Sequence, residues 1–154
     1  MQDFRIDSPA FFYYGRLRKL QQYVTQNLTR RLSLAEAAAV ANLERKYFST
    51  FFKEKVGVGY PTWIERVRIR AALQLIVNQD ITLYQAARNT GFRSIRTFQR
   101  AFKRQTGFTP SQFRRSARRL AATKTMGTGD RVQDFCRLSE DEWRVIKSAK
   151  SILL

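Results

Sequence analysis

Hydrophobic residues recur every three or four positions along most of the chain, which is the period of an amphipathic helix. The clearest case is the stretch 82–110, where Gly91 and Phe92 separate two such runs. The apolar positions are Leu83, Ala86 and Ala87 in the first run and Ile95, Phe98 and Phe102 in the second. Gly107 and Pro110 end the second run. Helix, glycine turn and helix form the pattern of a helix-turn-helix unit.

The same periodicity predicts helices on either side of this unit. They cover about residues 16–28, 34–41, 45–56, 61–78 and 111–120, and a further one opens at Ser139. Ser33 with Glu36, and Ser139 with Glu142, resemble capping boxes at helix starts. Pro61 suits the first turn of the long helix, where its missing N–H costs little. We therefore expect an all-α fold.

Residues 34–61 and 83–110 are two copies of one unit. Phe48 and Phe52 match Phe98 and Phe102 at an offset of 50 residues. Ala38 matches Ala87 at an offset of 49, so the second copy has one extra residue in its turn. Two copies of one pattern support the helix-turn-helix interpretation much more strongly than either copy alone.

The repeat predicts a homeodomain-like double helix-turn-helix fold. Two three-helix subdomains, 16–60 and 79–120, are joined by a linker helix at 61–78. We expect residues 1–15 to form an N-terminal arm that is irregular over 1–12 and either packs locally or is partly loose. Residues 121–154 should form a linker (121–130) and an extra C-terminal helix. The linker helix would be roughly 27 Å long, and adjacent major grooves lie about 34 Å apart. One chain could thus place two helices in successive grooves.

The formal charge of +17 and a sequence pI of about 11.1 indicate a polyanionic partner. Residues 57–118 carry twelve basic and two acidic side chains, so the excess lies in segments with a folding pattern. A disordered basic tail would have concentrated it at one end. We expect double-stranded DNA as the partner, ahead of an anionic membrane.

The sequence lacks the residues that several kinds of site require. Cys136 is the only cysteine and there is no histidine, so an intramolecular disulfide and a Cys/His zinc site are excluded. We find neither a nucleophile with a base beside it nor a phosphate-binding glycine loop, and expect no enzyme, metal or cofactor. No apolar run could span a membrane and the first residues do not form a signal peptide. We expect a cytoplasmic, nucleoid-associated protein.

The second helix of each unit is basic on its outward face and supplies the candidate DNA-contacting residues. These are Arg45, Lys46, Ser49, Thr50 and Lys53 in the first unit, and Arg93, Arg96, Thr97, Gln99, Arg100 and Arg104 in the second. Arginine paired with guanine is the commonest base contact, and a threonine methyl suits thymine. The alternative is a solvated basic face, and for Gln99 the two interpretations are equally good.

Other features leave alternatives open. The phenylalanines of both units favour core packing over base stacking because of their spacing. The last basic helix either clamps phosphates or keeps the surface soluble, and phosphate contact is favoured; its arginines are Arg114, Arg115, Arg118 and Arg119. The terminal helix, with Trp143 and Ile146, either docks on the domain or contacts a partner. Cys136 is a small apolar residue rather than a redox switch, because the chain has no resolving cysteine.

Residues 17–118 resemble the DNA-binding domain of the AraC/XylS family of bacterial transcription regulators. The residues that carry the resemblance are Ala38, Tyr47, Phe48, Ser49, Phe52, Lys53 and Gly57 in the first unit; Arg68, Ile69, Ala72, Leu75 and Ile76 in the linker helix; and Ala87, Gly91, Phe92, Phe98, Arg100, Phe102, Lys103, Gly107, Thr109, Pro110 and Phe113 in the second. The resemblance implies seven helices, two helix-turn-helix units and control of transcription, usually activation by contact with RNA polymerase.

Two departures from the family pattern matter. Thr50 stands where family members often have an arginine, which weakens the case for base readout by the first unit. Only about 16 residues precede the first helix, too few for an effector domain, so the chain resembles the stand-alone members. We expect a sequence-specific major-groove binder that acts as a transcription activator, with a monomer favoured over a dimer. The alternative is a protein-interaction module, for example an anti-regulator acting through the C-terminal helix.

Overall fold

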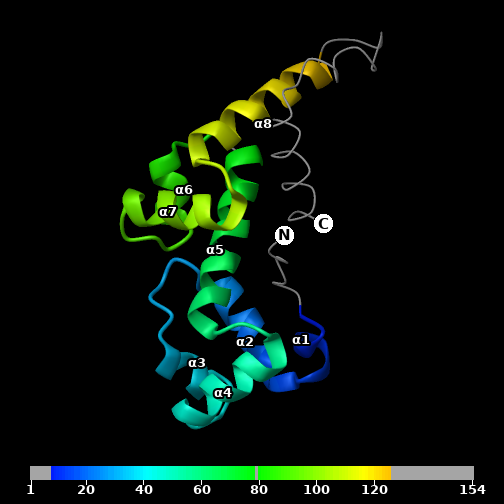
Figure 1. Cartoon of the computed structure of the whole chain (residues 1–154), viewed down its shortest axis with the longest axis vertical. Helices are drawn as coiled ribbons and strands as arrows, with labels where there is room; N and C mark the ends of the chain where they lie inside the picture. The colour runs from blue at the N-terminus through cyan, green and yellow to red at the C-terminus, as the bar shows by residue number, and fades with distance from the viewer. Residues whose placement is uncertain (1–7, 79, 126–154) are drawn as a thin grey trace.

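The structure, a computed structural model, describes residues 8–78 and 80–125. In these ranges the helices are α1 (Ala10–Tyr13), α2 (Gly15–Gln26), α3 (Leu34–Val40), α4 (Arg45–Val56), α5 (Tyr60–Asn78), α6 (Leu83–Asn89), α7 (Ile95–Thr106) and α8 (Pro110–Thr125). The long helix α5 joins a group formed by α1–α4 to a second group formed by α6–α8 (Figure 1). The expected all-α fold is confirmed, and no helix of the described part is long and apolar enough to cross a membrane.

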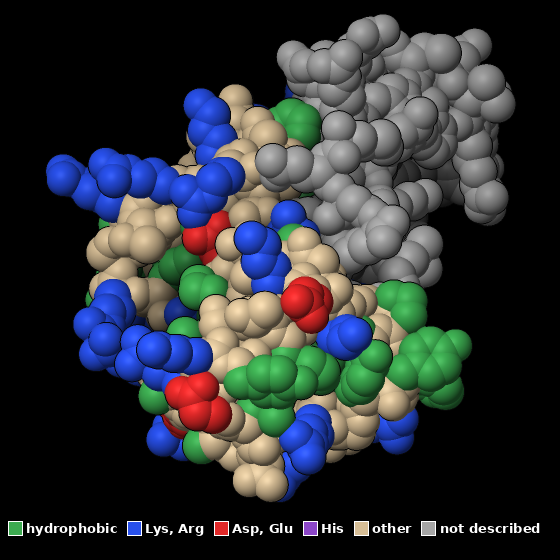
Figure 2. All heavy atoms as spheres, turned by 60° about the horizontal axis from the view of Figure 1, so that its bottom comes forward, with side chains coloured by type: hydrophobic (Ala, Val, Ile, Leu, Met, Phe, Trp, Pro, Cys, Tyr) green, Lys and Arg blue, Asp and Glu red, His purple; other side chains and the backbone are tan. Residues whose placement is uncertain are grey.

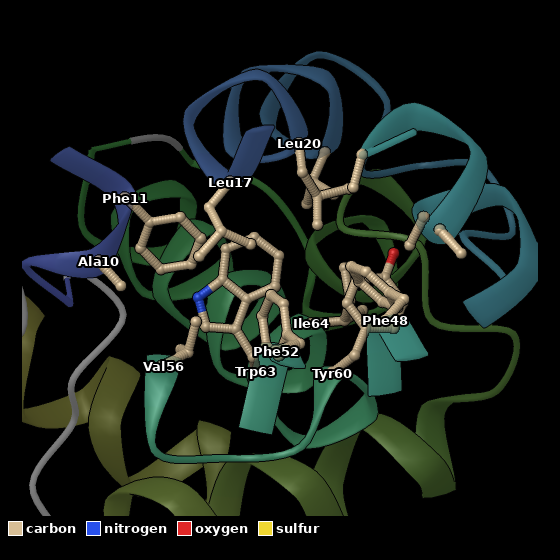
Figure 3. Close-up of a cluster of buried hydrophobic side chains, with 14 residues drawn as sticks. Ala10, Phe11, Leu17, Leu20, Phe48, Phe52, Val56, Tyr60, Trp63 and Ile64 are labelled. Carbon is tan, nitrogen blue, oxygen red and sulfur yellow. The ribbon is translucent and has the colours of Figure 1, made fainter. Parts of the chain in front are cut away.

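The first group is held by an aromatic core (Figure 3). Phe48 and Phe52 point inward from α4 and are fully buried, and Phe52 lies edge-on to Trp63 of α5 with ring centroids 5.5 Å apart. Leu17 and Leu20 close the core from α2. These are the positions that the 3.6-residue period selects, so the phenylalanines are core residues, as their spacing indicated.

In the described part of the N-terminal arm, Ala10 and Phe11 pack on this core, so local packing, one of the two outcomes expected for the arm, is found. The segment Ala10–Tyr13 is helical, although an irregular stretch was expected there. A single helical turn, α1, places Phe11 in the core, where its ring stacks on Trp63 at 5.1 Å. Phe11 is only 4 % exposed, and Ala10 beside it is also buried. A four-residue helix has no period to detect, so burial of one ring decides its position.

The two helix-turn-helix units have matching backbones. Four residues connect α3 to α4 and five connect α6 to α7, which confirms the extra residue in the second turn. Both turns contain a left-handed residue, Asn42 with φ 53° and Gly91 with φ 83°. Both second helices end at a left-handed glycine, Gly57 with φ 86° and Gly107 with φ 82°. The repeat in the sequence is therefore a repeat in structure.

Helix α5 belongs to both cores, so it is more than a linker between them. Trp63 and Ile64 lie in the first core, whereas Ile69, Leu73 and Ile76 lie in the second. The second core is completed by aromatic rings of α7 and α8, including Phe102 against Phe113. The change of buried face along one helix explains why its apolar residues point to more than one side.

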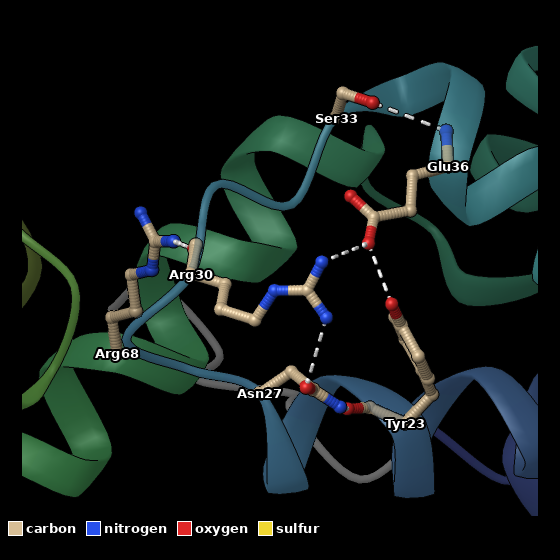
Figure 4. Close-up of polar contacts among 6 residues, drawn as sticks. All are labelled: Tyr23, Asn27, Arg30, Ser33, Glu36 and Arg68. Atoms are coloured by element: carbon tan, nitrogen blue, oxygen red, sulfur yellow. Dashed lines mark hydrogen bonds and ion pairs between the residues drawn. The ribbon is translucent and has the colours of Figure 1, made fainter.

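The expected capping box at Ser33 is half formed. The Ser33 hydroxyl accepts a hydrogen bond from the Glu36 backbone N–H at 3.1 Å, as expected. The Glu36 carboxylate turns instead to Tyr23, whose hydroxyl donates to it at 2.6 Å, and to Arg30 at 3.8 Å (Figure 4). A complete box caps α6, where Thr82 pairs with Gln85.

The last described helix is longer than expected. Helix α8 continues to Thr125, five residues into the stretch 121–130 that was expected to be a linker. The alanines in this stretch are strong helix formers, and they outweigh the small polar residues around them. The expected terminal helix from Ser139 onward, and Cys136, lie outside the described residues.

Candidate nucleic-acid interface

The start of each second helix is fixed by a side-chain cap. At α4 the Glu44 carboxylate accepts hydrogen bonds from the backbone N–H groups of Lys46 at 2.9 Å and Tyr47 at 3.1 Å. These hydrogen bonds lower the pKa of the Glu44 carboxyl group below its ordinary value, and the bond from Lys46 has the largest effect. At α7 the Ser94 hydroxyl accepts from the Thr97 N–H at 3.1 Å. These caps satisfy free N–H groups in the first turn of each helix and fix where α4 and α7 begin.

All eleven residues expected to contact DNA are exposed. On α4 the exposed residues Lys46, Ser49, Thr50 and Lys53 follow the spacing i, i+3, i+4, i+7. That spacing forms one stripe along a helix, opposite Phe48 and Phe52. Lysine and hydroxyl groups in this stripe suit phosphates and base edges.

The offset of 50 residues carries the α4 stripe onto α7 as Arg96, Gln99, Arg100 and Lys103. All four are exposed. We call these eight residues of α4 and α7 the paired stripes. Two helices thus present the same four positions, with lysine, serine, threonine and lysine on one and arginine, glutamine, arginine and lysine on the other.

Lys103 was not among the residues expected to contact DNA, whereas Arg104 was. Arg104 lies one position further around α7, and its guanidinium donates to Glu65 of α5, at 2.5 Å from Nη2 and 3.3 Å from Nε. Lys103 matches Lys53 at the offset of 50. The repeat alone could have found it, if the offset had been applied to the polar positions as well as to the phenylalanines.

Three other expected contacts lie at the edges of the paired stripes. Arg93 precedes Ser94, so it belongs to the turn and not to the helical face on which it was expected. Arg45 is the first residue of α4. The Thr97 hydroxyl lies 2.9 Å from the Ser94 hydroxyl, which leaves its methyl group as the part free for an apolar contact.

The arginines of α8 divide between structure and surface. Arg114 donates to the backbone carbonyl of Ile81 at 2.6 Å, and Arg118 forms an ion pair with Asp80 at 2.6 Å. These two hold α8 against the connection between α5 and α6. Arg115 is exposed, and the phosphate contact expected of the α8 arginines stays a prediction.

One face of the molecule combines basic and apolar surface. Figure 2 shows many Lys and Arg side chains on the left of this face and a band of hydrophobic side chains, with further basic side chains around it, on the lower right. Exposed aromatic residues include Tyr13 at 79 %, Phe12 at 73 % and Tyr47 at 58 %. Tyr47 stacks on Phe51, one turn further along α4, at 5.9 Å. The sequence pattern did not single out these exposed rings.

Comparison with known proteins finds similar sequences in proteins that are named as regulators. A family model described as "Helix-turn-helix domain" matches residues 37–116. The chain is 31 % identical over 101 residues to the arabinose operon regulatory protein of Escherichia coli, covering 65 % of this chain and 35 % of that protein. It is 33 % identical over 94 residues to the probable transcriptional regulator LumQ of Photobacterium leiognathi, covering 61 % and 38 %. The chain thus spans little more than a third of the length of these relatives.

Solved structures show the same arrangement of helices. The DNA-binding domain of AdpA, crystallised with a target DNA, is 25 % identical with a TM-score of 0.65, covering 73 % of this chain and 98 % of that one. An AraC-type regulator from Chromobacterium violaceum, 20 % identical, has a TM-score of 0.65 over 69 % of this chain and 95 % of that chain. With the helix-turn-helix model matching more than half of its length, the chain belongs to the AraC/XylS family of helix-turn-helix domains.

Proposed function

We propose that this chain binds double-stranded DNA with specificity for sequence, placing α4 and α7 in successive major grooves, and so regulates transcription. The observation that carries the proposal is the paired stripes. Two capped helices expose the same four positions, and five of those eight residues are lysine or arginine. A capped helix with one apolar and one basic face is the element that major grooves accept.

The length of α5 supports two-groove binding. Its 19 residues correspond to about 28 Å of helix, which is close to the distance of about 34 Å between successive major grooves on one face of DNA. The AdpA domain, whose arrangement of helices this chain shares, was crystallised in complex with a target DNA. One chain holding two such units can read a site for which single-unit proteins need a dimer, so we favour a monomer.

The two stripes have different parts in recognition. Arg96 and Arg100 of α7 can each make paired hydrogen bonds to guanine, and Gln99 can pair with adenine. At the matching position α4 has Thr50, which forms at most one weaker base contact. We therefore assign most of the sequence discrimination to α7, and mainly phosphate contact to α4 through Lys46 and Lys53.

Binding to duplex DNA at two salt concentrations tests this function. Each phosphate contact that is lost should reduce the slope of log affinity against log salt by about 0.9. We expect wild-type binding to fall steeply with salt, and Lys53→Ala and Lys103→Ala each to reduce the slope. A duplex affinity that is independent of salt would contradict the proposal.

Regulation requires partners as well as DNA. The relatives are named as regulators, and the family resemblance implies activation through RNA polymerase, so we propose that contact for this chain. Such a protein would act in the cytoplasm, at the nucleoid. A promoter assay tests this role. Reporter expression that increases when the wild-type chain is present, and increases less with Arg100→Ala, would support activation. Reporter expression that decreases when the wild-type chain is present would indicate repression.

A further inference from the structure

Helix α7 is tied at its C-terminal end to α5. The Glu65 carboxylate accepts two hydrogen bonds from Arg104, and a third from the Gln105 side chain at 2.8 Å. Glu65 lies beside Ile64, in the part of α5 that packs in the first core. Its side chain is only 23 % exposed, so the ion pair is partly shielded from water. The end of one recognition helix is thus fixed to the unit that carries the other.

A second tie lies just before the start of α7. A Cβ atom at Gly91 would be 2.1 Å from the carbonyl oxygen of Leu28, so the turn of the second unit lies directly against the chain after α2. Arg68 of α5 lies at the same place, 3.0 Å from that Cβ position through Nε. Its Nη2 donates to the Arg30 carbonyl oxygen at 2.8 Å (Figure 4). The turn, α5 and the loop after α2 therefore meet at one contact.

These ties restrict α7 in a way that α5 alone does not. If a single helix were the only link between the two cores, a change in its gentle curvature would change the angle between the units. Contacts at both ends of α7 remove that freedom. A shift of one base pair moves a groove by about 3.4 Å along the axis and about 35° around it. If α7 moved by this amount relative to α5, the hydrogen bonds of 2.5–3.3 Å to Glu65 would break.

We propose that Glu65, together with the Gly91 contact, is a positioning residue that fixes α7 relative to α4 and so sets the spacing of the two DNA blocks that the chain accepts. The inference rests on the proposed DNA binding. It also gives Arg104 a role other than DNA contact: its guanidinium holds the helix that the stripe residues use.

Affinity for DNA sites of altered spacing tests the inference. The probe is the duplex that the wild-type chain selects from a random pool, with one base pair inserted or removed between its two blocks. We expect the wild type to lose about tenfold or more in affinity, and Glu65→Ala to lose about threefold or less. Arg104→Ala should relax the spacing to the same extent, with an unchanged salt slope, and the double variant should add nothing further.

Two variants separate positioning from folding and from charge. Glu65→Gln keeps an oxygen acceptor and should restore part of the wild-type spacing penalty. Glu54→Ala removes a carboxylate from the exposed surface of α4 and should keep the full penalty. A full penalty in Glu65→Ala, or a salt slope reduced by about 0.9 in Arg104→Ala, would overturn the inference. Failure of the wild type to bind any selected duplex would overturn the proposed function as well.

Discussion

In the proposed function, single side chains decide how each stripe would read DNA. Arg100 and Thr50 occupy matching positions 50 residues apart, yet only the arginine can form two hydrogen bonds with one base. Arg104 carries the same group as Arg100, but its partner Glu65 lies 39 residues away along the chain. No local pattern reveals that partner, so the sequence could show where the arginines are but not which of them is bound by a carboxylate of the same protein.

Arg100→Ala and Thr50→Ala should therefore differ. Arg100→Ala should cost about 1–3 kcal/mol of binding free energy at the selected site and relax base preference at one position. Thr50→Ala should cost less and leave the base preference intact. Competition between duplexes that differ at single positions measures both. Unchanged discrimination in Arg100→Ala would mean that α7 does not read bases there.

Arg114 and Arg115 are neighbours with different expected roles. Arg114→Ala removes the charged group that donates a partly buried hydrogen bond to the Ile81 carbonyl oxygen. We expect this substitution to lower the free energy of unfolding by about 1.5–3 kcal/mol. Arg115→Ala should change it by less than about 0.5 kcal/mol. Urea unfolding of the two variants gives the comparison. Equal stabilities would remove the structural role assigned to Arg114.

Elements were predictable wherever a period or a cap was present. The helices from α2 to α7 lie within about a residue or two of their expected limits, because their apolar stripes and glycine ends are local signals. Helix α1 has neither, and it depends on the packing of Phe11 against Trp63. The Ser33 cap formed, but Glu36 found a tertiary partner in Tyr23. The local capping and periodicity rules therefore failed where a side chain made a contact with a residue distant in the sequence.

The turn before α7 can be tested with a matched pair of glycines. Gly91 and Gly107 share a left-handed backbone, but only Gly91 has a neighbour within 4 Å of the Cβ position. Gly107→Ala should cost about 1–2 kcal/mol of stability, from backbone strain. Gly91→Ala adds a clash with the Leu28 carbonyl and should cost about 3 kcal/mol or more. Equal losses of thermal stability would argue against the close contact.

The stabilisation that comes from the Glu65 hydrogen bonds should depend on pH. Burial raises the pKa of its carboxyl group, but hydrogen bonds from Arg104 and Gln105 outweigh burial and bring it below its ordinary value. A lowered folded-state pKa stabilises the protein above the unfolded-state pKa of about 4.3, and this stabilisation is lost as pH falls through the folded value. The stability difference between wild type and Glu65→Gln should be constant from about pH 7 to 5 and shrink below about pH 4. A difference that persists unchanged at pH 3 would contradict the ion pair.

At the scale of the whole molecule, the repeat was the most informative signal. It predicted two units, the helix between them and the position of both basic faces, and the structure shows all three. How the units are locked together could not be predicted, because the Gly91 contact with Leu28 joins residues 63 positions apart. Another contact between residues far apart in the sequence, Phe11 on Trp63, places the turn of α1 in the first core.

The most direct test of the central claim is selection of bound sequences from a random duplex pool, followed by measurement of the number of chains on each selected site. If α4 and α7 enter successive grooves, one chain should bind one asymmetric site with two sequence blocks about 10 base pairs apart, the better specified block belonging to α7. An inverted repeat bound by two chains, or a single short block, would contradict the account.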